Sequence, residues 1–508
     1  MPAFHTPAHA VQWLRSLGVQ GLSTDTRELE AADAFIAWPG LATDPRRFVE
    51  PALAQGAVAC LVEQAGAHAF AWDAGRVGLV EGLKAAAGPL AAEFYGQPSD
   101  ELSVIAVTGT NGKTSTAWWL AQALGRLSRD VEGNESPAAA AWACGVIGTL
   151  GVGVPPALSA TGFTTPDPVM LQKTLRKFVA QGLRACAVEA SSIGIEEMRL
   201  TGTAIHTAIF TNWTQDHLDY HGSMAAYWAA KRALFDWPGL RAAVVNLDDA
   251  KGVELAAELV GAPLDLWTVG IQREARVMAR AVTHSATGLA FDVVEAGQSV
   301  RLQSQAVGSY NVSNLLGVVA AMRALGIDLA AAVRACEELL PVPGRMECVG
   351  GLAEPLVVVD YAHTPDALAQ ALGALQPIAR ERGGQLWCVF GCGGDRDATK
   401  RPLMGAVAAA HADRAVVTSD NPRSEKPESI VAQILLGMVE CPRVEVQVDR
   451  ALAVADTIGK AAVADVILLA GKGHEATQET AGVKLPFSDL AHARAGLERR
   501  ARRLEVAA

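Results

Sequence analysis

The sequence is poor in cysteine and has no long apolar run, and each shortage excludes a class of protein. Eight cysteines are spread over 508 residues without a CxxC pair, which excludes a disulfide framework and a zinc knuckle. No apolar run reaches the ~18 residues needed to cross a bilayer, and the first residues show no basic segment followed by an apolar one. We therefore expect a cytoplasmic protein without membrane insertion.

Charge is scarce as well. Charged residues make up 19% of the chain, below the ~25% typical of soluble proteins, whereas 50% of the residues are hydrophobic, so a disordered chain is excluded. The net charge of −11 makes the average surface repel a phosphate backbone. We expect a monomer that acts on small molecules and does not bind nucleic acid.

The second feature is a repeated pattern of short β-branched runs, polar or glycine-rich loops and amphipathic helical stretches, which is typical of a parallel α/β fold. Ligands bind beyond the carboxyl ends of such strands, so we expect the chemistry in the loops that follow them. The runs with their loops are 103–108, 185–191, 207–212, 242–249, 356–362, 386–394, 414–423 and 466–475.

Two breaks divide the chain. The polar stretch 96–101 precedes the first strong strand, and prolines with a glycine at 341–345 interrupt a helical pattern. At ~150 residues per domain, 508 residues also predict about three domains. We predict an N-terminal domain at 1–98, a central P-loop ATPase-type parallel sheet domain at 99–342 and a C-terminal Rossmann-like α/β domain at 343–508. Residues 128–141 are expected to form an inserted surface loop.

The strongest motif is TGTNGKTS at 108–115, between an expected strand and an expected helix. Glycines allow backbone N–H groups to converge on phosphate oxygens, the lysine adds a charge and the following hydroxyl suits Mg²⁺. The strict Walker pattern fails, because Val107 stands where it needs glycine. The alternative is an ordinary strand-to-helix turn. The candidate nucleotide-binding residues are Gly109, Thr110, Asn111, Gly112, Lys113, Thr114 and Ser115.

Acidic, imidazole and amine groups follow the central strands. Glu189, His217 and Lys231 are each unremarkable alone, since a carboxylate or lysine at such a place is usually solvated. Together with Thr114 beside a phosphate loop, Glu189 and His217 offer ligands to Mg²⁺ bridging nucleotide phosphates.

Two arginine-bearing loops, 391–405 and 419–427, and the loop 470–478 follow strands of the last domain. The planar guanidinium group of arginine can bind a carboxylate through two hydrogen bonds. Surface salt bridges are the alternative reading. Because the strands are expected to be parallel, these loops should meet at one sheet edge and form a small-ligand site.

At these residues the sequence resembles the Mur ligase family of peptidoglycan synthesis over essentially its whole length. The resemblance rests on many separate strings in one order, which chance does not explain. They are TGTNGKTS (108–115), TTPDP (164–168), VEASS (188–192), TNWTQDHLDYHG (211–222), YNVSNLL (310–316), VPGRME (342–347), DYAHTPDAL (360–368), GCGGDRDATKRPLMG (391–405), DNPR (420–423) and GKGHEATQ (471–478).

The resemblance implies roles for individual residues. Lys113, Glu189, His217 and Lys231 would be catalytic, with Thr114, Glu189, His217 and an N-carbamylated Lys231 (N6-carboxylysine) holding Mg²⁺. Cations near Lys231 would keep its amine neutral enough to capture CO₂. The ATP contacts beyond the loop would be Asn311, Arg345 and Asp360. The contacts to the UDP-muramoyl dipeptide would be Asp25, Thr26, Arg27, Thr164, Thr165, Ser191 and Arg199. The amino-acid pocket would be Arg396, Asp420, Asn421, Arg423, Gly471 and Glu475.

The implied activity is an ATP-dependent amide ligation through an acyl phosphate. The resemblance assigns UDP-N-acetylmuramoyl-L-alanyl-D-glutamate as the acceptor, and Arg423 favours meso-diaminopimelate, whose distal carboxylate it can bind, over L-lysine. The open alternatives are an L-lysine-adding ligase, a folylpolyglutamate synthetase and a nucleotide-binding regulatory or transport ATPase.

Three positions depart from the family pattern. Ile193 replaces a customary histidine, Thr214 and Gln215 replace a serine and an arginine before Asp216, and Ala32 replaces a glycine. The N-terminal domain therefore keeps less of the pattern than the other two.

Overall fold

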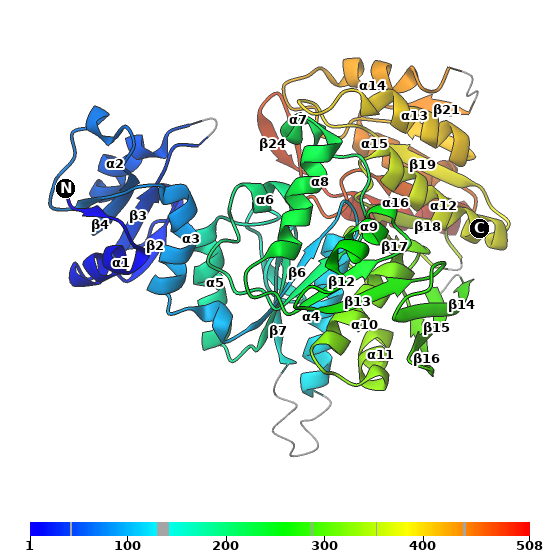
Figure 1. Cartoon of the computed structure of the whole chain (residues 1–508). Helices are drawn as coiled ribbons and strands as arrows, with labels where there is room; N and C mark the ends of the chain where they lie inside the picture. The colour runs from blue at the N-terminus through cyan, green and yellow to red at the C-terminus, as the bar shows by residue number, and fades with distance from the viewer. Residues whose placement is uncertain (41–42, 130–141, 286–287, 352, 440–442, 508) are drawn as a thin grey trace.

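The structure is a computed structural model that describes residues 1–40, 43–129, 142–285, 288–351, 353–439 and 443–507. Three sheets follow one another along the chain, each between helices (Figure 1), so the predicted α/β class is confirmed. The expected boundaries at 98 and 342 fall between these sheets and stay predictions. The expected loop at 128–141 lies almost wholly outside the described residues. None of the described helices is long and apolar enough to cross a membrane.

The N-terminal sheet is parallel, in the order β1-β5-β4-β3-β2. Helices α1 and α3 cover one face and α2 covers the other. This sheet was not predicted, and two of its strands, β1 and β2, are only two and three residues long. The elements are β1 (Ala3–Phe4), α1 (Pro7–Ser16), β2 (Gly21–Ser23), β3 (Asp33–Ala37), α2 (Val49–Ala54), β4 (Ala59–Glu63), β5 (Val77–Val80) and α3 (Leu83–Phe94).

The central sheet has the order β16-β15-β14-β13-β12-β11-β6-β10-β7-β8-β9, with parallel pairing from β7 to β14 and antiparallel ends. Its strands are β6 (Ser103–Thr108), β7 (Cys144–Gly148), β8 (Gly151–Val154), β9 (Ala157–Ser159), β10 (Ala185–Glu189), β11 (Thr207–Phe210), β12 (Ala242–Asn246), β13 (Asp265–Gly270), β14 (Val277–Ser285), β15 (Gly288–Glu295) and β16 (Gln298–Ser304).

Helices cover both faces of this sheet and form two apolar cores. One core joins α4, α10 and α11 to the sheet, and the other joins α5 and α9. Helix α5 begins sharply because Asp167 caps it and Pro168 fills its first position. The helices are α4 (Lys113–Arg129), α5 (Pro168–Ala180), α6 (Ser192–Glu196), α7 (Leu218–His221), α8 (Met224–Arg232), α9 (Ala250–Leu259), α10 (Tyr310–Ala324) and α11 (Leu329–Glu337).

The C-terminal sheet has the order β17-β18-β22-β19-β20-β21, parallel except for β17. Helices α12, α13 and α14 pack on one face, and α15 and α16 on the other. The elements are β17 (Glu347–Val349), β18 (Leu356–Asp360), α12 (Pro365–Arg382), β19 (Leu386–Phe390), α13 (Lys400–His411), β20 (Arg414–Val417), α14 (Pro427–Leu435), β21 (Val444–Val446), α15 (Arg450–Lys460), β22 (Val466–Ala470), the hairpin β23 (Thr477–Thr480) and β24 (Val483–Pro486), and α16 (Asp489–Ala507).

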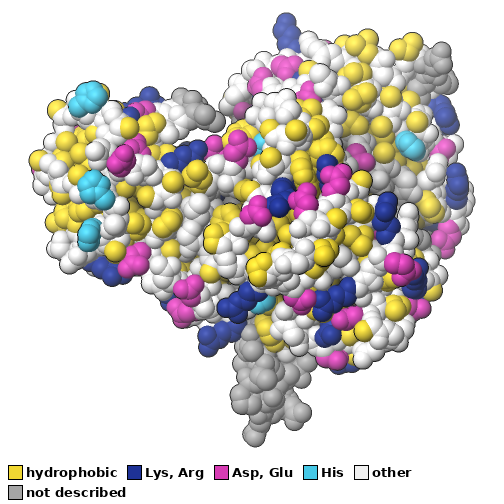
Figure 2. Space-filling view, in the orientation of Figure 1, with side chains coloured by type: hydrophobic (Ala, Val, Ile, Leu, Met, Phe, Trp, Pro, Cys, Tyr) yellow, Lys and Arg dark blue, Asp and Glu magenta, His cyan; other side chains and the backbone are white. Residues whose placement is uncertain are grey.

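All eight predicted parallel strands are present, as β6, β10, β11, β12, β18, β19, β20 and β22. The carboxyl ends of β6, β10, β11, β12 and β18 border one cavity, and those of β19, β20 and β22 lie along the same edge of the C-terminal sheet as that of β18. On the face in Figure 2, acidic and basic side chains are intermixed with apolar ones, as on an ordinary solvated surface.

Candidate active site

A cavity of about 410 Å³ lies at the carboxyl ends of β6, β10, β11 and β18. Its wall combines the central domain with the C-terminal one, because the loop before β17 and the start of α12 close one side. Thirteen of the predicted site residues line it: Thr110, Asn111, Gly112, Lys113, Thr114, Ser115, Thr164, Glu189, Ser191, His217, Asn311, Arg345 and Asp360.

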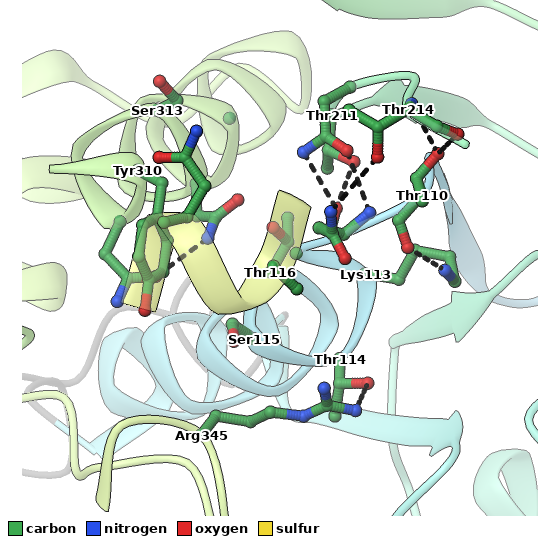
Figure 3. A pocket seen from close by; sticks show the side chains of 18 of the residues that line it. Thr110, Lys113, Thr114, Ser115, Thr116, Thr211, Thr214, Tyr310, Ser313 and Arg345 are labelled. Carbon is green, nitrogen blue, oxygen red and sulfur yellow. Dashed lines mark hydrogen bonds between the residues drawn. The ribbon is translucent and has the colours of Figure 1, made fainter. Parts of the chain in front are cut away.

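The phosphate-binding loop is held by close backbone approaches. Gly109 and Gly112 have φ of 144° and 85°, and a Cβ at either would collide with Thr211 or Asn314. The Lys113 amine donates to the carbonyls of Gly109 and Thr110 at 2.9 and 2.8 Å, so it lies over the loop (Figure 3). Burial lowers the pKa of Lys113. Asn212 accepts the N–H groups of Thr110 and Asn111, so the amine of Lys113 and the N–H groups at the start of α4 are the donors nearest the cavity.

Thr114 and Glu189 lie together at the base of this cavity. The Thr114 hydroxyl donates to Glu189 Oε2 at 2.9 Å, and Arg345 reaches the same hydroxyl at 3.2 Å (Figure 3). Thr149, which follows β7, donates its N–H to Glu189 Oε1 at 2.8 Å. Glu189 is therefore a buried carboxylate ringed by hydroxyl and amide donors.

His217 stands across the cavity beside Asp216. Its Nε2 lies 3.5 Å from Asp216 Oδ2, while His363 of the C-terminal domain lies 4.0 Å from the same oxygen. Burial lowers the pKa of His217 to about 4, so its imidazole is neutral at pH 7. A neutral imidazole has a free lone pair, which a metal ligand requires. Across the described residues, no three His, Cys, Asp or Glu side chains form a metal cluster on their own.

Lys231 does not line the cavity but lies directly behind the phosphate loop. Its side chain is buried, donates to the Gly109 carbonyl at 2.7 Å and lies 4.4 Å from the Tyr227 ring centre. Burial, reinforced by the charge of Lys113, holds the pKa of Lys231 well below its usual range. The surface-lysine alternative therefore does not describe this residue.

The remaining predicted ATP residues, Asn311, Arg345 and Asp360, line the same cavity. Asn311 is buried and donates to the Val307 carbonyl at 2.7 Å. Arg345 stacks 4.4 Å from the Tyr361 ring centre. Asp360 accepts the N–H groups of Met346 and Ala362, each at 2.8 Å, and burial raises its pKa.

A second cavity, of about 370 Å³, lies between the N-terminal and central domains and is lined by Asp25, Arg27 and Arg199. Arg199 donates to the Thr165 carbonyl at 2.9 Å, and the Thr165 hydroxyl donates to the Glu189 carbonyl at 2.6 Å. These contacts link the second cavity to the first. Thr26 and Thr165 are the predicted residues of this group that line neither cavity.

The predicted amino-acid residues form a separate cluster at the ends of β19, β20 and β22, which are neighbours in the sheet as predicted. Asn421 donates to Glu475 Oε2 at 2.7 Å, and Asp420 is buried beside Gly471. Arg423 donates to the Gly394 carbonyl at 2.7 Å. Arg396 is on the same loop as Gly394. It donates to the Asp395 carbonyl at 3.2 Å, so its side chain lies against its own loop.

This cluster touches the nucleotide cavity through the loop 471–475. Gly473 packs on Gly344 and Tyr361, and the His474 ring lies 5.5 Å from the Tyr361 ring centre. The two sets of residues are therefore adjacent although they line different spaces. Sequence reasoning missed four residues of this region, Thr149, His363, Tyr361 and the buried Lys472. The signal for the last three was present, since they lie within the strings DYAHTPDAL and GKGHEATQ.

The comparisons with known proteins agree with this arrangement. Residues 107–322 match the Mur ligase middle domain, and residues 344–473 match the Mur ligase, glutamate ligase domain. A relative from Acidovorax sp. strain JS42, named UDP-N-acetylmuramoyl-L-alanyl-D-glutamate--2,6-diaminopimelate ligase, is 59% identical over 98% of this chain and 99% of its own. The chain belongs to the Mur ligase family. A relative of the same name from Pseudomonas aeruginosa is 44% identical over 95% of this chain and 96% of its own.

Solved structures of Mur ligases share the fold. One, titled as a UDP-N-acetylmuramoyl-L-alanyl-D-glutamate--2,6-diaminopimelate ligase, matches with a TM-score of 0.64 and 35% identity over 95% of each chain. A MurF from Acinetobacter baumannii matches with a TM-score of 0.67 over 97% of this chain and 98% of its own, at 18% identity. The second likeness shows the three-domain Mur ligase fold alone.

Proposed function

We propose that this Mur ligase joins meso-diaminopimelate to the D-glutamyl residue of UDP-N-acetylmuramoyl-L-alanyl-D-glutamate at the expense of ATP, in cytoplasmic peptidoglycan precursor synthesis. The observation that carries the proposal is a phosphate-binding loop beside a second cluster of charged residues, joined to it by the loop 471–475. The name of the Acidovorax relative supports the choice of both substrates.

ATP is proposed to bind with its phosphates over the loop at Lys113 and its base near Asn311. The backbone N–H groups at the start of α4 and the Lys113 amine attract phosphate oxygens. Arg345, which reaches Thr114 from the loop before β17, adds a second cation. These groups are fixed before the reaction, so they stabilise charge on the transferring phosphoryl group at little cost in reorganisation.

Mg²⁺ is proposed to bind at Thr114, Glu189 and His217. The oxygens of Thr114 and Glu189 are 2.9 Å apart and are of the type that Mg²⁺ prefers, and the neutral His217 imidazole offers a nitrogen. When bound, the ion would neutralise negative charge on the phosphates. The lowered pKa of buried Lys231 favours the neutral amine, which can add CO₂ with loss of a proton, and the resulting carbamate would be a fourth ligand, anionic like Glu189.

With the substrates bound in this way, the ligation proceeds in two steps. The D-glutamyl carboxylate attacks the γ-phosphorus, ADP leaves and an acyl phosphate forms. The amine of the amino acid attacks the acyl carbon, phosphate leaves and the amide forms. Thr164 and Ser191 line the cavity on the side that leads through Arg199 to Asp25 and Arg27, so the UDP-muramoyl dipeptide is proposed to extend that way.

The choice of amino acid is proposed to depend on Arg423. One of its nitrogens is fixed on the Gly394 carbonyl, which leaves the rest of the fork for a carboxylate. Lysine lacks the distal carboxylate of meso-diaminopimelate, so binding it would leave this arginine without its partner.

Release of phosphate from ATP tests the proposal against the rival of a plain nucleotide-binding ATPase. We expect release only when ATP, the UDP-muramoyl dipeptide and an amino acid are all present. Release from ATP alone at the same rate would contradict a ligase and favour the rival.

A further inference from the structure

Lys472 is a fully buried lysine that the proposed chemistry does not use. It follows β22 in the loop 471–475, and its side chain is 0% exposed. Its ammonium donates to Asn421 Oδ1 at 3.0 Å and to Glu475 Oε2 at 2.9 Å, and it lies 5.8 Å from the Phe487 ring centre. A buried charge is costly unless it is paired and hydrogen-bonded, so these two contacts account for its presence there.

The first contact fixes the orientation of Asn421. A side-chain amide has an acceptor end and a donor end, which differ only in which way the group is turned. Both Lys472 and the Glu479 N–H, at 3.0 Å, donate to Oδ1. The amide nitrogen must therefore face Glu475, to which it donates at 2.7 Å.

The second contact occupies only one of the two oxygens of the Glu475 carboxylate. Lys472 and Asn421 both donate to Oε2, while Oε1 has no protein hydrogen-bond partner among the described residues. The Glu475 side chain is 29% exposed, so the carboxylate is not sealed inside the protein. Asp420, also buried in the cluster, adds a second carboxylate, and burial raises its pKa while Arg450 and Lys472 oppose that rise.

We propose that Lys472 is a positioning residue for the incoming amino acid, which it serves by holding Asn421 and Glu475 so that Glu475 Oε1 receives an ammonium group of that substrate. The inference rests on the proposed function. Lys472 itself does not touch the substrate in this account. Its neighbour Gly473 packs on Gly344 and Tyr361, so the loop that carries it is anchored on the nucleotide side as well.

The test is a comparison of KM values in K472M. The variant keeps the length of the side chain but loses its charge and both hydrogen bonds. We expect KM for meso-diaminopimelate to rise roughly 10- to 100-fold, the range for lost charged hydrogen bonds, with KM for ATP and for the UDP-muramoyl dipeptide within about twofold. K472R, which retains the charge, should recover part of the loss.

The matched control is K460M. Lys460 also pairs with a glutamate, Glu445, at 2.6 Å, but its side chain is 55% exposed and lies on α15 away from the cluster. We expect all three KM values to stay at the wild-type level. A purely structural role for Lys472 predicts instead that K472M raises all three KM values together, or lowers only the melting temperature.

N421D keeps the proposal testable if K472M does not fold. It leaves an acceptor for Lys472 and Glu479 but replaces the donor that faces Glu475, so it should also raise KM selectively for meso-diaminopimelate. An unchanged KM in N421D or in folded K472M, with the wild type active, would overturn the role of Lys472 alone. If the wild type ligates a different amino acid, the substrate assignment fails and the same comparison is made with that amino acid. A wild type that ligates none contradicts both proposals.

Discussion

The pKa of the Lys231 amine is set by the groups around it. The residue follows no strand and sits in the short helix α8, yet its amine is buried behind the phosphate loop and donates to the Gly109 carbonyl. Burial and the charge of Lys113 lower its pKa, so the neutral amine that reacts with CO₂ is more populated here than in a solvated lysine.

Replacing Lys231 with alanine should lower ligation by at least about 100-fold, because in the proposed site it removes a metal ligand, which exceeds the 10–100-fold typical of supporting residues. Addition of a small carboxylate such as acetate should restore part of the rate. The measurement is turnover with and without acetate. Full activity in K231A would return Lys231 to a structural role.

His474 provides a pH test. Burial, with the charge of Arg345, lowers its pKa to about 4, and its Nδ1 is buried without a partner among the described residues. The folded state then binds fewer protons than the unfolded state between pH 6.5 and 4, so the free energy of unfolding falls as the pH falls through this window, by at most about 3 kcal/mol.

The H474Q variant should flatten this dependence in urea titrations between pH 6.5 and 4. H411Q is the control, because His411 is exposed at the end of α13. An equal pH dependence in H474Q and the wild type would show that other groups cause it.

Sequence reasoning found residues within continuous motifs but missed contacts made across the sheet. Thr149 supports Glu189 because β7 and β10 are neighbours, although the two residues are 40 positions apart. Lys472 was missed because a lysine in a glycine-rich loop is usually solvated, and only the fold shows that this one is buried.

Among the elements, α4 and the loop before it each contain a glycine, and the two glycines have different roles. Gly109 has a positive φ and its missing Cβ makes room for Thr211, whereas Gly125 within α4 has open space around it. G109A should therefore weaken ATP binding by about tenfold or more, equal to ~1.4 kcal/mol.

G125A should instead stabilise the protein by about 0.5–1 kcal/mol, because alanine loses less backbone entropy in a helix. Nucleotide titration and urea unfolding of both variants check the pair. ATP binding unaffected in G109A would contradict the account of the loop.

A buried ion pair joins α15 to α16. Arg450 and Asp489 are both 0% exposed and 2.7 Å apart, and Arg450 also donates to the carbonyls of Ser419 and Ala470, at the ends of β20 and β22. R450M would leave Asp489 buried without its charge partner, so the free energy of unfolding should fall by about 3–5 kcal/mol. Urea unfolding measures it, and R450M/D489L should lose less; an equal or larger loss in the double variant would contradict this explanation.

Eight parallel strands could be predicted because each is an apolar run that is largely buried on both faces. The antiparallel strands β15 and β16 were not predicted, because neither is a continuous apolar run. In β15 buried and partly exposed positions alternate, which is typical of a strand with one exposed face, and β16 carries polar residues such as Arg301.

At the scale of the whole molecule, the nucleotide cavity is shared between domains. Asn111 of the phosphate loop donates to Asp366 at the start of α12, at 3.3 Å, and Arg345 reaches Thr114 at 3.2 Å. The sequence predicted three domains and the family, but not these contacts, because domain placement depends on interfaces that no local pattern encodes.

The net charge of −11 also constrains how the protein binds its substrates. ATP and the UDP-muramoyl dipeptide are anionic and diaminopimelate carries two carboxylates, so the protein must concentrate positive charge locally. It does so at Lys113 and Arg345 in one cavity, at Arg199 and Arg27 in the second, and at Arg423 in the C-terminal cluster.

The most direct test of the central claim is the mass of the product formed from ATP and the UDP-muramoyl dipeptide with meso-diaminopimelate or L-lysine. We predict the tripeptide containing diaminopimelate, with kcat/KM for lysine lower by roughly 10⁴–10⁵-fold, the penalty for an analogue that leaves a charged partner unpaired. R423A should lose most of this preference. Comparable turnover of the wild type with lysine would contradict the account.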